Sequence, residues 1–120
     1  MQESGEMYLE TILVISREKP NVRSIDIANR MGYSKPSVSR AVNLLKNEGY
    51  IDIDEHGSIT LRAPGRKVAE TIYERHVVLA ELLMRIGVDE VTASVDACKI
   101  EHDISDVTFE AIKKHMTNNS

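Results

Sequence analysis

Residues 24–61 read SIDIANRMGYSKPSVSRAVNLLKNEGYIDIDEHGSITL, and the first part of this stretch contains two short helical patterns. The first helix is predicted to start at Ser24 as its N-cap and to stop at Gly32, which can adopt the left-handed conformation of a helix C-terminus. The second is predicted over residues 34–47, because Ser34 can cap it and a proline follows in its first turn. Two short helices joined by a glycine-containing turn are typical of a helix-turn-helix.

Two segments of alternating apolar and polar side chains come directly after the second helix. They cover residues 51–53 and 58–61, and the intervening residues 54–57 have the composition of a turn. This pattern predicts a small β-hairpin. A hairpin in this place is the wing of a winged helix-turn-helix.

The rest of the chain shows helical periodicity. Further helices are predicted over residues 6–18, 64–86, 91–103 and 106–116. The predicted fold class is therefore mainly α with a small β-hairpin. We expect an N-terminal winged helix-turn-helix domain at residues 1–63 and a C-terminal helical segment at residues 64–120.

Charge is distributed unevenly along the 120 residues, whose formal net charge is −4. Residues 23–67 carry eight basic and five acidic side chains, whereas residues 76–120 carry four basic and eight acidic ones. A basic front half suits contact with the phosphates of nucleic acid, and an acidic back half suits a divalent cation.

Several classes of protein are disfavoured. No apolar run approaches the roughly 20 residues that a membrane-spanning helix needs, so no membrane role is expected. The acidic N-terminus does not resemble a secretory signal, and the lone Cys98 cannot form an internal disulfide. These features predict a cytoplasmic protein. An enzyme is not expected, because no general base or nucleophile stands apart from the candidate metal ligands.

The predicted second helix of the helix-turn-helix should present polar side chains outward, because its apolar residues face the core. Arg40 could bind a guanine edge with two hydrogen bonds, and short hydroxyl groups could meet phosphates or base edges. DNA is favoured over RNA, since no strand carries aromatic side chains on which unpaired bases could stack. The alternative is a helical hairpin with a merely solvated outer face. The predicted DNA-binding residues are Arg23, Ser34, Lys35, Pro36, Ser37, Ser39 and Arg40.

A candidate metal site lies near the C-terminus. Cys98, Glu101 and His102 are spaced i, i+3 and i+4, which places a thiol, a carboxylate and an imidazole on one face of a helix. This borderline-soft set suits Fe(II), Co(II), Ni(II) or Zn(II) better than Ca(II) or Mg(II). The alternative is an ordinary polar helix face.

Three more candidate ligands occur elsewhere. Met7 and Glu10 lie one turn apart on the first predicted helix, and they add a thioether and a carboxylate on a shared face. His76, beside Arg75 in the long predicted helix, supplies another imidazole. By itself, a single histidine in this position is more often a surface residue.

The whole chain resembles the diphtheria toxin repressor family of iron- and manganese-dependent regulators, in a short form without the SH3-like domain of longer members. The resemblance covers nearly all of residues 3–115. Its motifs are Glu6-Met7-Tyr8-Leu9-Glu10, Ser34-Lys35-Pro36-Ser37-Val38-Ser39, Arg75-His76 and Cys98-x-x-Glu101-His102.

The resemblance implies that Met7, Cys98, Glu101 and His102 surround one metal ion and that Glu10 and His76 contribute to the same or a neighbouring ion. It also implies that residues 64–120 are a metal-binding and dimerisation domain.

Two departures from the family pattern bear on the choice of metal. Met7 and Cys98 are similar to iron-type members, whereas Glu10 is similar to manganese-type members, so the ligand set is a hybrid. Iron-type members have an ancillary site whose glutamate and histidine correspond to Ala80 and Ser94 in this chain. The ancillary site is therefore not expected to be complete.

Together these features predict a metal-dependent, DNA-binding transcriptional repressor of metal-ion homeostasis. Fe(II) is the expected cofactor and Mn(II) the alternative, while Co(II), Ni(II) or Zn(II) could bind in vitro. A homodimer should bind a pseudo-palindromic operator of double-stranded DNA. The alternative function is a winged-helix regulator in which Cys98 acts as a redox switch.

Overall fold

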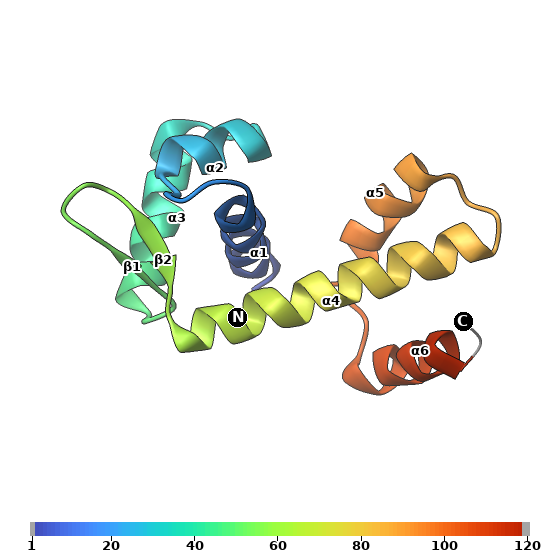
Figure 1. The fold of residues 1–120 in the computed structure, drawn as a ribbon. Coiled ribbons are helices and arrows are strands. Elements are labelled where there is room, and N and C mark those ends of the chain that lie inside the picture. The colour runs from blue at the N-terminus through green and yellow to red at the C-terminus, as the bar shows by residue number, and fades with distance from the viewer. Residues whose placement is uncertain (1, 119–120) are drawn as a thin grey trace. The chain divides into compact units, whose positions relative to one another are not determined.

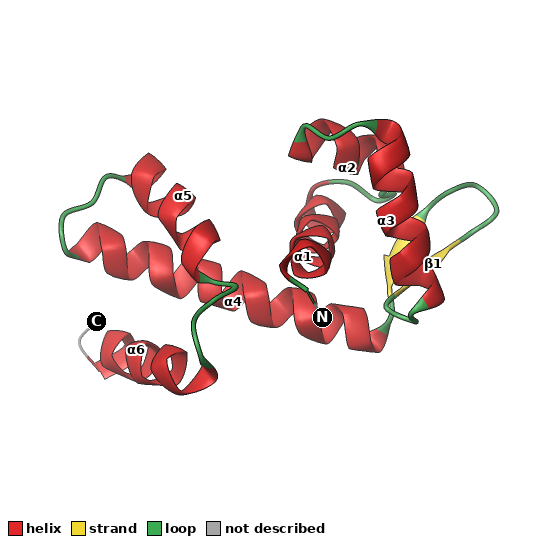
Figure 2. Ribbon diagram, turned by 180° about the vertical axis from the view of Figure 1, so that it is seen from behind, coloured by secondary structure: helices red, strands yellow, loops and turns green. Residues whose placement is uncertain are grey.

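A computed structural model describes residues 2–118, and these residues form six helices and one two-stranded antiparallel sheet (Figures 1 and 2). In chain order the elements are α1 (Glu3–Glu18), α2 (Ser24–Met31), α3 (Lys35–Asn47), β1 (Ile51–Ile53), β2 (Ile59–Leu61), α4 (Ala63–Arg85), α5 (Glu90–Ile100) and α6 (Asp106–Asn118). The predicted fold class is confirmed. No helix among the described residues is long and apolar enough to cross a bilayer.

The chain divides into two compact units, residues 1–70 and 71–120, and α4 contributes its first turns to one and the remainder to the other. In the first unit, α1 packs against α2, α3 and β2. Apolar side chains from each of these elements are almost fully buried there. This core consists chiefly of Leu9, Ile12 and Leu13 of α1, Ile27 of α2, Val38 and Val42 of α3, and Ile51 and Ile59 of the hairpin.

The turn between α2 and α3 agrees with the prediction. Gly32 has φ 71°, in the left-handed region, and its N–H donates to Ala28 O at 2.9 Å. Ser34 is the N-cap of α3, and its hydroxyl accepts from the backbone N–H of Ser37 at 3.3 Å. This cap satisfies a donor that the first turn of a helix leaves unpaired. The helix-turn-helix is therefore closed by local hydrogen bonds.

The start of α2 differs from the prediction. Ser24 was expected to be the N-cap, but Arg23 occupies that position and Ser24 is the first helical residue. The physical reason is that the Asp26 carboxylate accepts from the backbone N–H of Arg23 at 2.9 Å. An acidic side chain three residues into the helix thus performs the capping that we had expected from a hydroxyl.

The predicted hairpin forms, as an antiparallel pair of β1 and β2. Ile51 pairs with Leu61 and Ile53 with Ile59, and the Ile59 N–H donates to Val22 O at 2.7 Å. The Ile59 side chain is buried as well, so both the backbone and the side chain of this residue attach β2 to the first unit.

The second unit consists of α4 from residue 71 onward, α5 and α6. Gly87, at φ 107°, lies in the turn after α4, and Asp89 caps α5 by accepting from Thr92 N–H at 3.0 Å. The buried apolar residues of this unit are Ile72, Leu79, Ala93, Ala97, Phe109 and Met116.

The end of α5 corrects the prediction of a helix over residues 91–103. The helix ends at Ile100, and residues 101–103 form a turn. The carbonyls of Glu101 and Ile104 accept hydrogen bonds from the guanidinium of Arg75 on α4, at 3.2 and 2.8 Å. A side chain from another helix therefore binds backbone groups where α5 stops.

Candidate metal centre and DNA-reading helix

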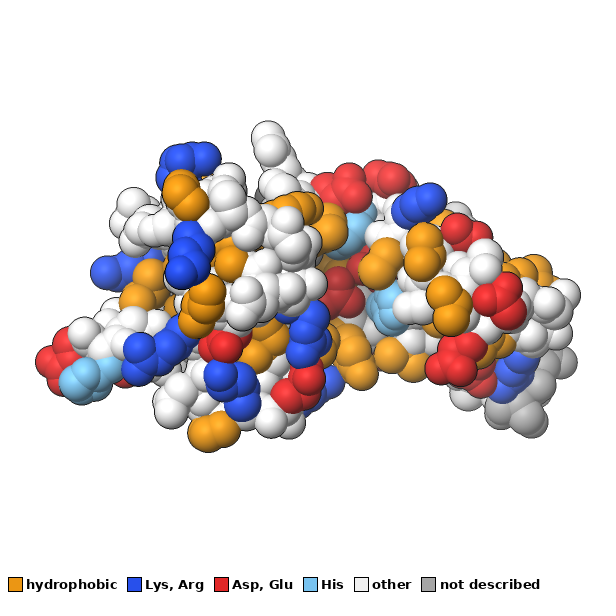
Figure 3. Space-filling model, turned by 90° about the horizontal axis from the view of Figure 1, so that it is seen from above, with side chains coloured by type: hydrophobic (Ala, Val, Ile, Leu, Met, Phe, Trp, Pro, Cys, Tyr) orange, Lys and Arg blue, Asp and Glu red, His pale blue; other side chains and the backbone are white. Residues whose placement is uncertain are grey.

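Six of the seven residues that were predicted to bind DNA lie on α3 or at its N-cap, and the seventh, Arg23, is the N-cap of α2. Of those seven side chains, only Ser37 is half-buried, and the others are exposed. The Ser34 hydroxyl donates to Ser37 Oγ at 2.9 Å, and Arg40 Nη2 lies 3.4 Å from the same oxygen. On the face shown in Figure 3, most Lys and Arg side chains lie over the first unit. Contact with DNA by these residues remains a prediction.

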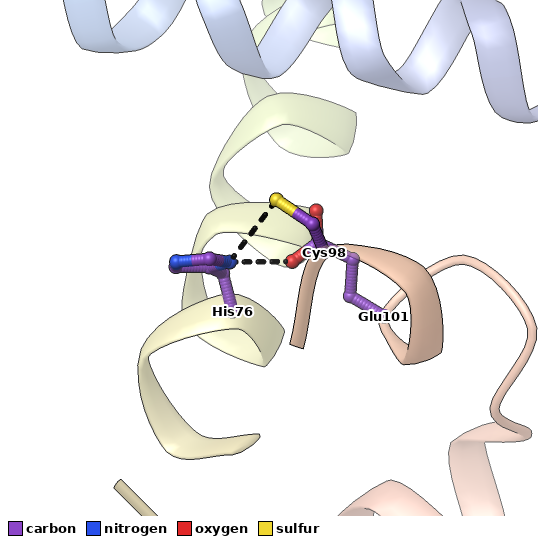
Figure 4. A group of neighbouring side chains, drawn as sticks. All are labelled: His76, Cys98 and Glu101. Carbon is purple, nitrogen blue, oxygen red and sulfur yellow. Dashed lines mark hydrogen bonds and ion pairs between the residues drawn. The ribbon is translucent and has the colours of Figure 1, made fainter. Parts of the chain in front are cut away.

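Three candidate ligands of the second unit come together. His76 lies on α4, Cys98 lies in the last turn of α5, and Glu101 is the C-cap of α5. Their ligand atoms all lie within 4.8 Å of one another (Figure 4). Nδ1 of His76 lies 2.9 Å from Glu101 Oε2 and 3.8 Å from Cys98 Sγ. An imidazole, a cysteine sulfur and a carboxylate therefore converge on one point.

His102 lies next to this cluster. Its Nε2 atom is 3.4 Å from Glu101 Oε1, and the side chains of both residues are almost fully buried. Glu101 Oε1 accepts no hydrogen bond, which is costly for a buried carboxylate oxygen. A cation at this oxygen would offset that cost, and the mixed N, S and O donors are those that first-row divalent ions prefer. The residues therefore fit a divalent transition metal.

The electrostatics of the cluster act most strongly on His76. Its hydrogen bond with Cys98, and next its hydrogen bond with Glu101, raise the pKa of His76 to about 10. The two acceptors thus hold the metal-free imidazole in its protonated form. A histidine binds a metal ion through a nitrogen that carries no proton, so a ligand at this Nδ1 has to displace the proton.

Met7 and Glu10 remain separate candidates. Both lie on α1, one turn apart and half-buried, and they belong to the first unit. His76, Cys98, Glu101 and His102 belong to the second. Within the second unit His76, Cys98 and Glu101 come together. That all six residues serve one ion or two neighbouring ions stays a prediction.

Two residues beside the cluster were not expected to take part in it. Ser94 Oγ lies 3.4 Å from His76 Nε2, on the opposite side of the imidazole from Cys98 and Glu101. Arg75 is buried and binds the backbone of the turn that carries Glu101. Neither contact could be predicted from the sequence, because both depend on how α4 and α5 pack. Arg75 binds a backbone carbonyl, which every residue carries, and Ser94 lies beside a ring nitrogen.

Family profiles match both halves of the chain. Residues 1–58 match the N-terminal DNA binding domain of the iron dependent repressors, and residues 63–120 match their metal binding and dimerisation domain. The transcriptional regulator MntR of Escherichia coli O6:H1 is 33% identical over 106 residues, which cover 88% of this chain and 68% of the relative. An uncharacterized HTH-type transcriptional regulator of Methanocaldococcus jannaschii is 31% identical over 118 residues, which cover 97% of this chain and 94% of the relative.

Solved structures share the fold. The manganese regulator SloR superposes with a TM-score of 0.82 at 28% identity, over 94% of this chain and 53% of that chain. A manganese-dependent transcriptional repressor in complex with manganese has a TM-score of 0.86 at 26% identity, over 94% of this chain and 52% of that chain. This chain thus spans about half the length of these two solved proteins.

Proposed function

The chain belongs to the family of iron-dependent repressors, and from this membership we propose that it is a metal-dependent, DNA-binding transcriptional repressor. The members of this family are transcriptional regulators and not enzymes. The observation that carries the proposal is the convergence of His76, Cys98 and Glu101 in the part of the chain that matches a metal binding and dimerisation domain. A winged helix-turn-helix precedes it in the same chain.

In the proposed mechanism, α3 enters the major groove of DNA. Its N-terminus presents Ser34 and Lys35 to the phosphate backbone, where the helix dipole also favours negative charge. Arg40, one turn further on, reaches the edge of a base. The second unit pairs with its copy in a homodimer, so that two α3 helices read the halves of a pseudo-palindromic operator.

In the metal centre, His76, Cys98, Glu101 and His102 would hold the ion, and Met7 and Glu10 are the further proposed ligands. The ion supplies positive charge to a cluster that contains a buried carboxylate. His76 would bind the ion through a nitrogen that carries no proton, and the positive charge would offset the burial of Glu101 Oε1, which accepts no hydrogen bond. Because the proposed donors come from both units, an ion that bound them all would favour one orientation of the DNA-reading unit. In this way the centre would raise operator affinity.

We propose Fe(II) as the physiological effector and Mn(II) as the second candidate. Cys98 supports Fe(II), because a thiolate is a softer ligand than the oxygen donors that suit Mn(II). Glu10 and the kinship to a manganese regulator and a manganese-dependent repressor support Mn(II). Co(II), Ni(II) and Zn(II) are useful probes of the same donors.

The test is an anaerobic titration of the metal-free full-length chain with Fe(II), Mn(II) and Zn(II). Binding to a duplex selected from a random-sequence library would be followed at constant salt, since affinity for DNA depends steeply on salt. We expect Fe(II) to bind and to strengthen duplex binding. If Mn(II) does so at lower free concentration than Fe(II), the second candidate is correct. If no metal alters DNA binding, the metal-dependent mechanism is wrong.

Two variants give this test its controls. Cys98→Glu replaces the thiolate by a carboxylate, and we expect it to shift the preference toward Mn(II). Arg40→Ala should weaken duplex binding while it leaves the affinity for metal unchanged, because Arg40 lies in the other unit from the clustered ligands.

A further inference from the structure

Arg75 is the one basic side chain among the buried residues of the described chain, with 8% of its surface exposed. It lies on α4, directly before the candidate ligand His76. Its Nη1 atom donates to Glu101 O at 3.2 Å and to Ile104 O at 2.8 Å, and Nη2 pairs with the carboxylate of Asp106. The guanidinium also lies over the ring of Phe109, 5.4 Å from its centroid. All these groups belong to the second unit.

The partners of Arg75 lie in and just after the turn that contains two candidate ligands. Residues 101–105 join α5 to α6, and Glu101 and His102 are the first two of them. Carbonyls at the end of a helix lack partners within the helix. Arg75 provides such a partner for Glu101, so one side chain of α4 fixes the backbone of a ligand that has to meet the neighbouring His76.

We propose that Arg75 is a positioning residue of the metal centre. It holds the turn after α5 against α4, so that the Glu101 carboxylate and the His76 imidazole face each other at 2.9 Å. This inference rests on the proposed function, because it assumes that the cluster binds a metal ion. Arg75 itself is not a proposed metal ligand. It acts only through the backbone of Glu101 and the helix that carries His76.

The geometry calls for arginine rather than lysine. The guanidinium binds two carbonyls, a carboxylate and a ring face at once, and its planar fork of donors allows this. An ammonium group is a single point charge on a flexible stem. Nε of Arg75 is buried without a hydrogen-bond partner, so the contacts of Nη1 and Nη2 have to offset the cost of burial.

Lys113 offers a matched control. Its ammonium lies 3.1 Å from Glu74 Oε2 and therefore also links α6 to α4, but both side chains are partly exposed. Neither side chain forms a hydrogen bond or ion pair with residues 101–105 of the described chain. Removing this link tests whether any loosening between α4 and α6 disturbs the metal centre.

The experiment compares Arg75→Met, Arg75→Lys and Lys113→Met with the unaltered full-length chain. Affinity for Co(II) would be measured by competition with a chelator, and the absorption spectrum would be recorded at saturating Co(II), since band positions and intensities report the arrangement of ligands. Circular dichroism would establish that each variant is folded. If Arg75→Met does not fold, Arg75→Lys carries the comparison.

We expect Arg75→Met to bind Co(II) roughly 10- to 100-fold more weakly, as is found when groups that orient metal ligands are removed. Arg75→Lys should fall between this variant and the unaltered chain, and both should show an altered spectrum at saturation. Lys113→Met should match the unaltered chain in both measurements.

Unchanged affinity and spectrum in a folded Arg75 variant would overturn the inference, as would equal effects in Lys113→Met. In either case the proposed function would stand, because the unaltered chain would still bind the ion. Absence of Co(II) binding by the unaltered chain would instead contradict the proposed function, and the role of Arg75 with it.

Discussion

At the scale of single residues, Glu101 contributes most to the candidate centre. Its carboxylate is fully buried, Oε2 pairs with His76, and Oε1 accepts no hydrogen bond. We expect Glu101→Gln to lower metal affinity by at least about 100-fold, more than the loss of a group that only orients a ligand. Glutamine fills the same volume and can still accept from His76, so the charge is the main loss. Equilibrium dialysis with Fe(II), Mn(II) or Co(II) would measure the effect.

Glu110→Gln is the control for this prediction. It makes the same chemical change at an exposed position on α6. Equal affinities of the two variants would show that Glu101 is not a ligand.

Asp26 makes a residue-scale prediction about pH. Its carboxylate accepts hydrogen bonds from Lys19 Nζ and from the Arg23 N–H, both at 2.9 Å. The hydrogen bond from Lys19 has the larger effect, and together the two hold the pKa of Asp26 below its usual range. An Asp whose pKa is lower in the folded state than in the unfolded state stabilises the fold. This contribution is present above the pKa of the unfolded state, about 3.9, and is lost as the pH falls through the pKa of the folded state. We therefore expect Asp26→Asn to be less stable at neutral pH and to lose less stability between about pH 4 and pH 2. Urea unfolding at a series of pH values would measure this, and parallel pH profiles of variant and wild type would contradict it.

Spacing in the sequence predicted which residues of the second unit share a face. Cys98, Glu101 and His102 were placed on one face because of their intervals, and the structure clusters Cys98 with Glu101 although α5 ends between them. Arg75 could not be assigned a role in this way. Its acceptors are two carbonyls, which every residue carries, and only the packing of α4 against the turn selects them.

At the scale of secondary-structure elements, the N-terminus of α3 is the most informative. Ser34 caps the helix that is proposed to read DNA, and its hydroxyl accepts from Ser37 N–H. We expect Ser34→Ala to lower the free energy of unfolding of the first unit by about 1 kcal/mol, the usual cost of losing such a cap. Chemical denaturation would measure the change.

Ser39→Ala provides the comparison within the same helix. Ser39 is exposed in the interior of α3, where alanine favours helix formation, so no loss of stability is expected. If both variants lose the same free energy, the cap does not stabilise α3 as described.

Local signals explain which elements could be predicted. The left-handed turn at Gly32, the helix cap at Ser34 and the β-hairpin were each predicted from residues that are close in the sequence, and the structure confirms all three. The errors at Ser24 and after Ile100 occur where a side chain takes over a hydrogen bond at a helix end. Asp26 does so within α2, and Arg75 does so from another helix.

At the scale of the whole molecule, the proposed mechanism couples two units that carry different chemistry. The basic residues of the first half of the sequence and the acidic residues of the second half suggested phosphate contact and cation binding, respectively. The sequence could not predict which ion is bound, because Cys98 and Glu10 favour different metals. Thermodynamic linkage requires that a metal which strengthens DNA binding is itself bound more tightly when DNA is present, by the same factor.

The most direct test of this coupling is the metal affinity of the full-length chain, measured with and without a saturating duplex that the metal-loaded protein has selected. We predict that the duplex tightens metal binding by roughly 5- to 150-fold, the range of typical allosteric coupling. Equal metal affinities with and without the duplex would contradict the claim that the metal centre controls DNA binding.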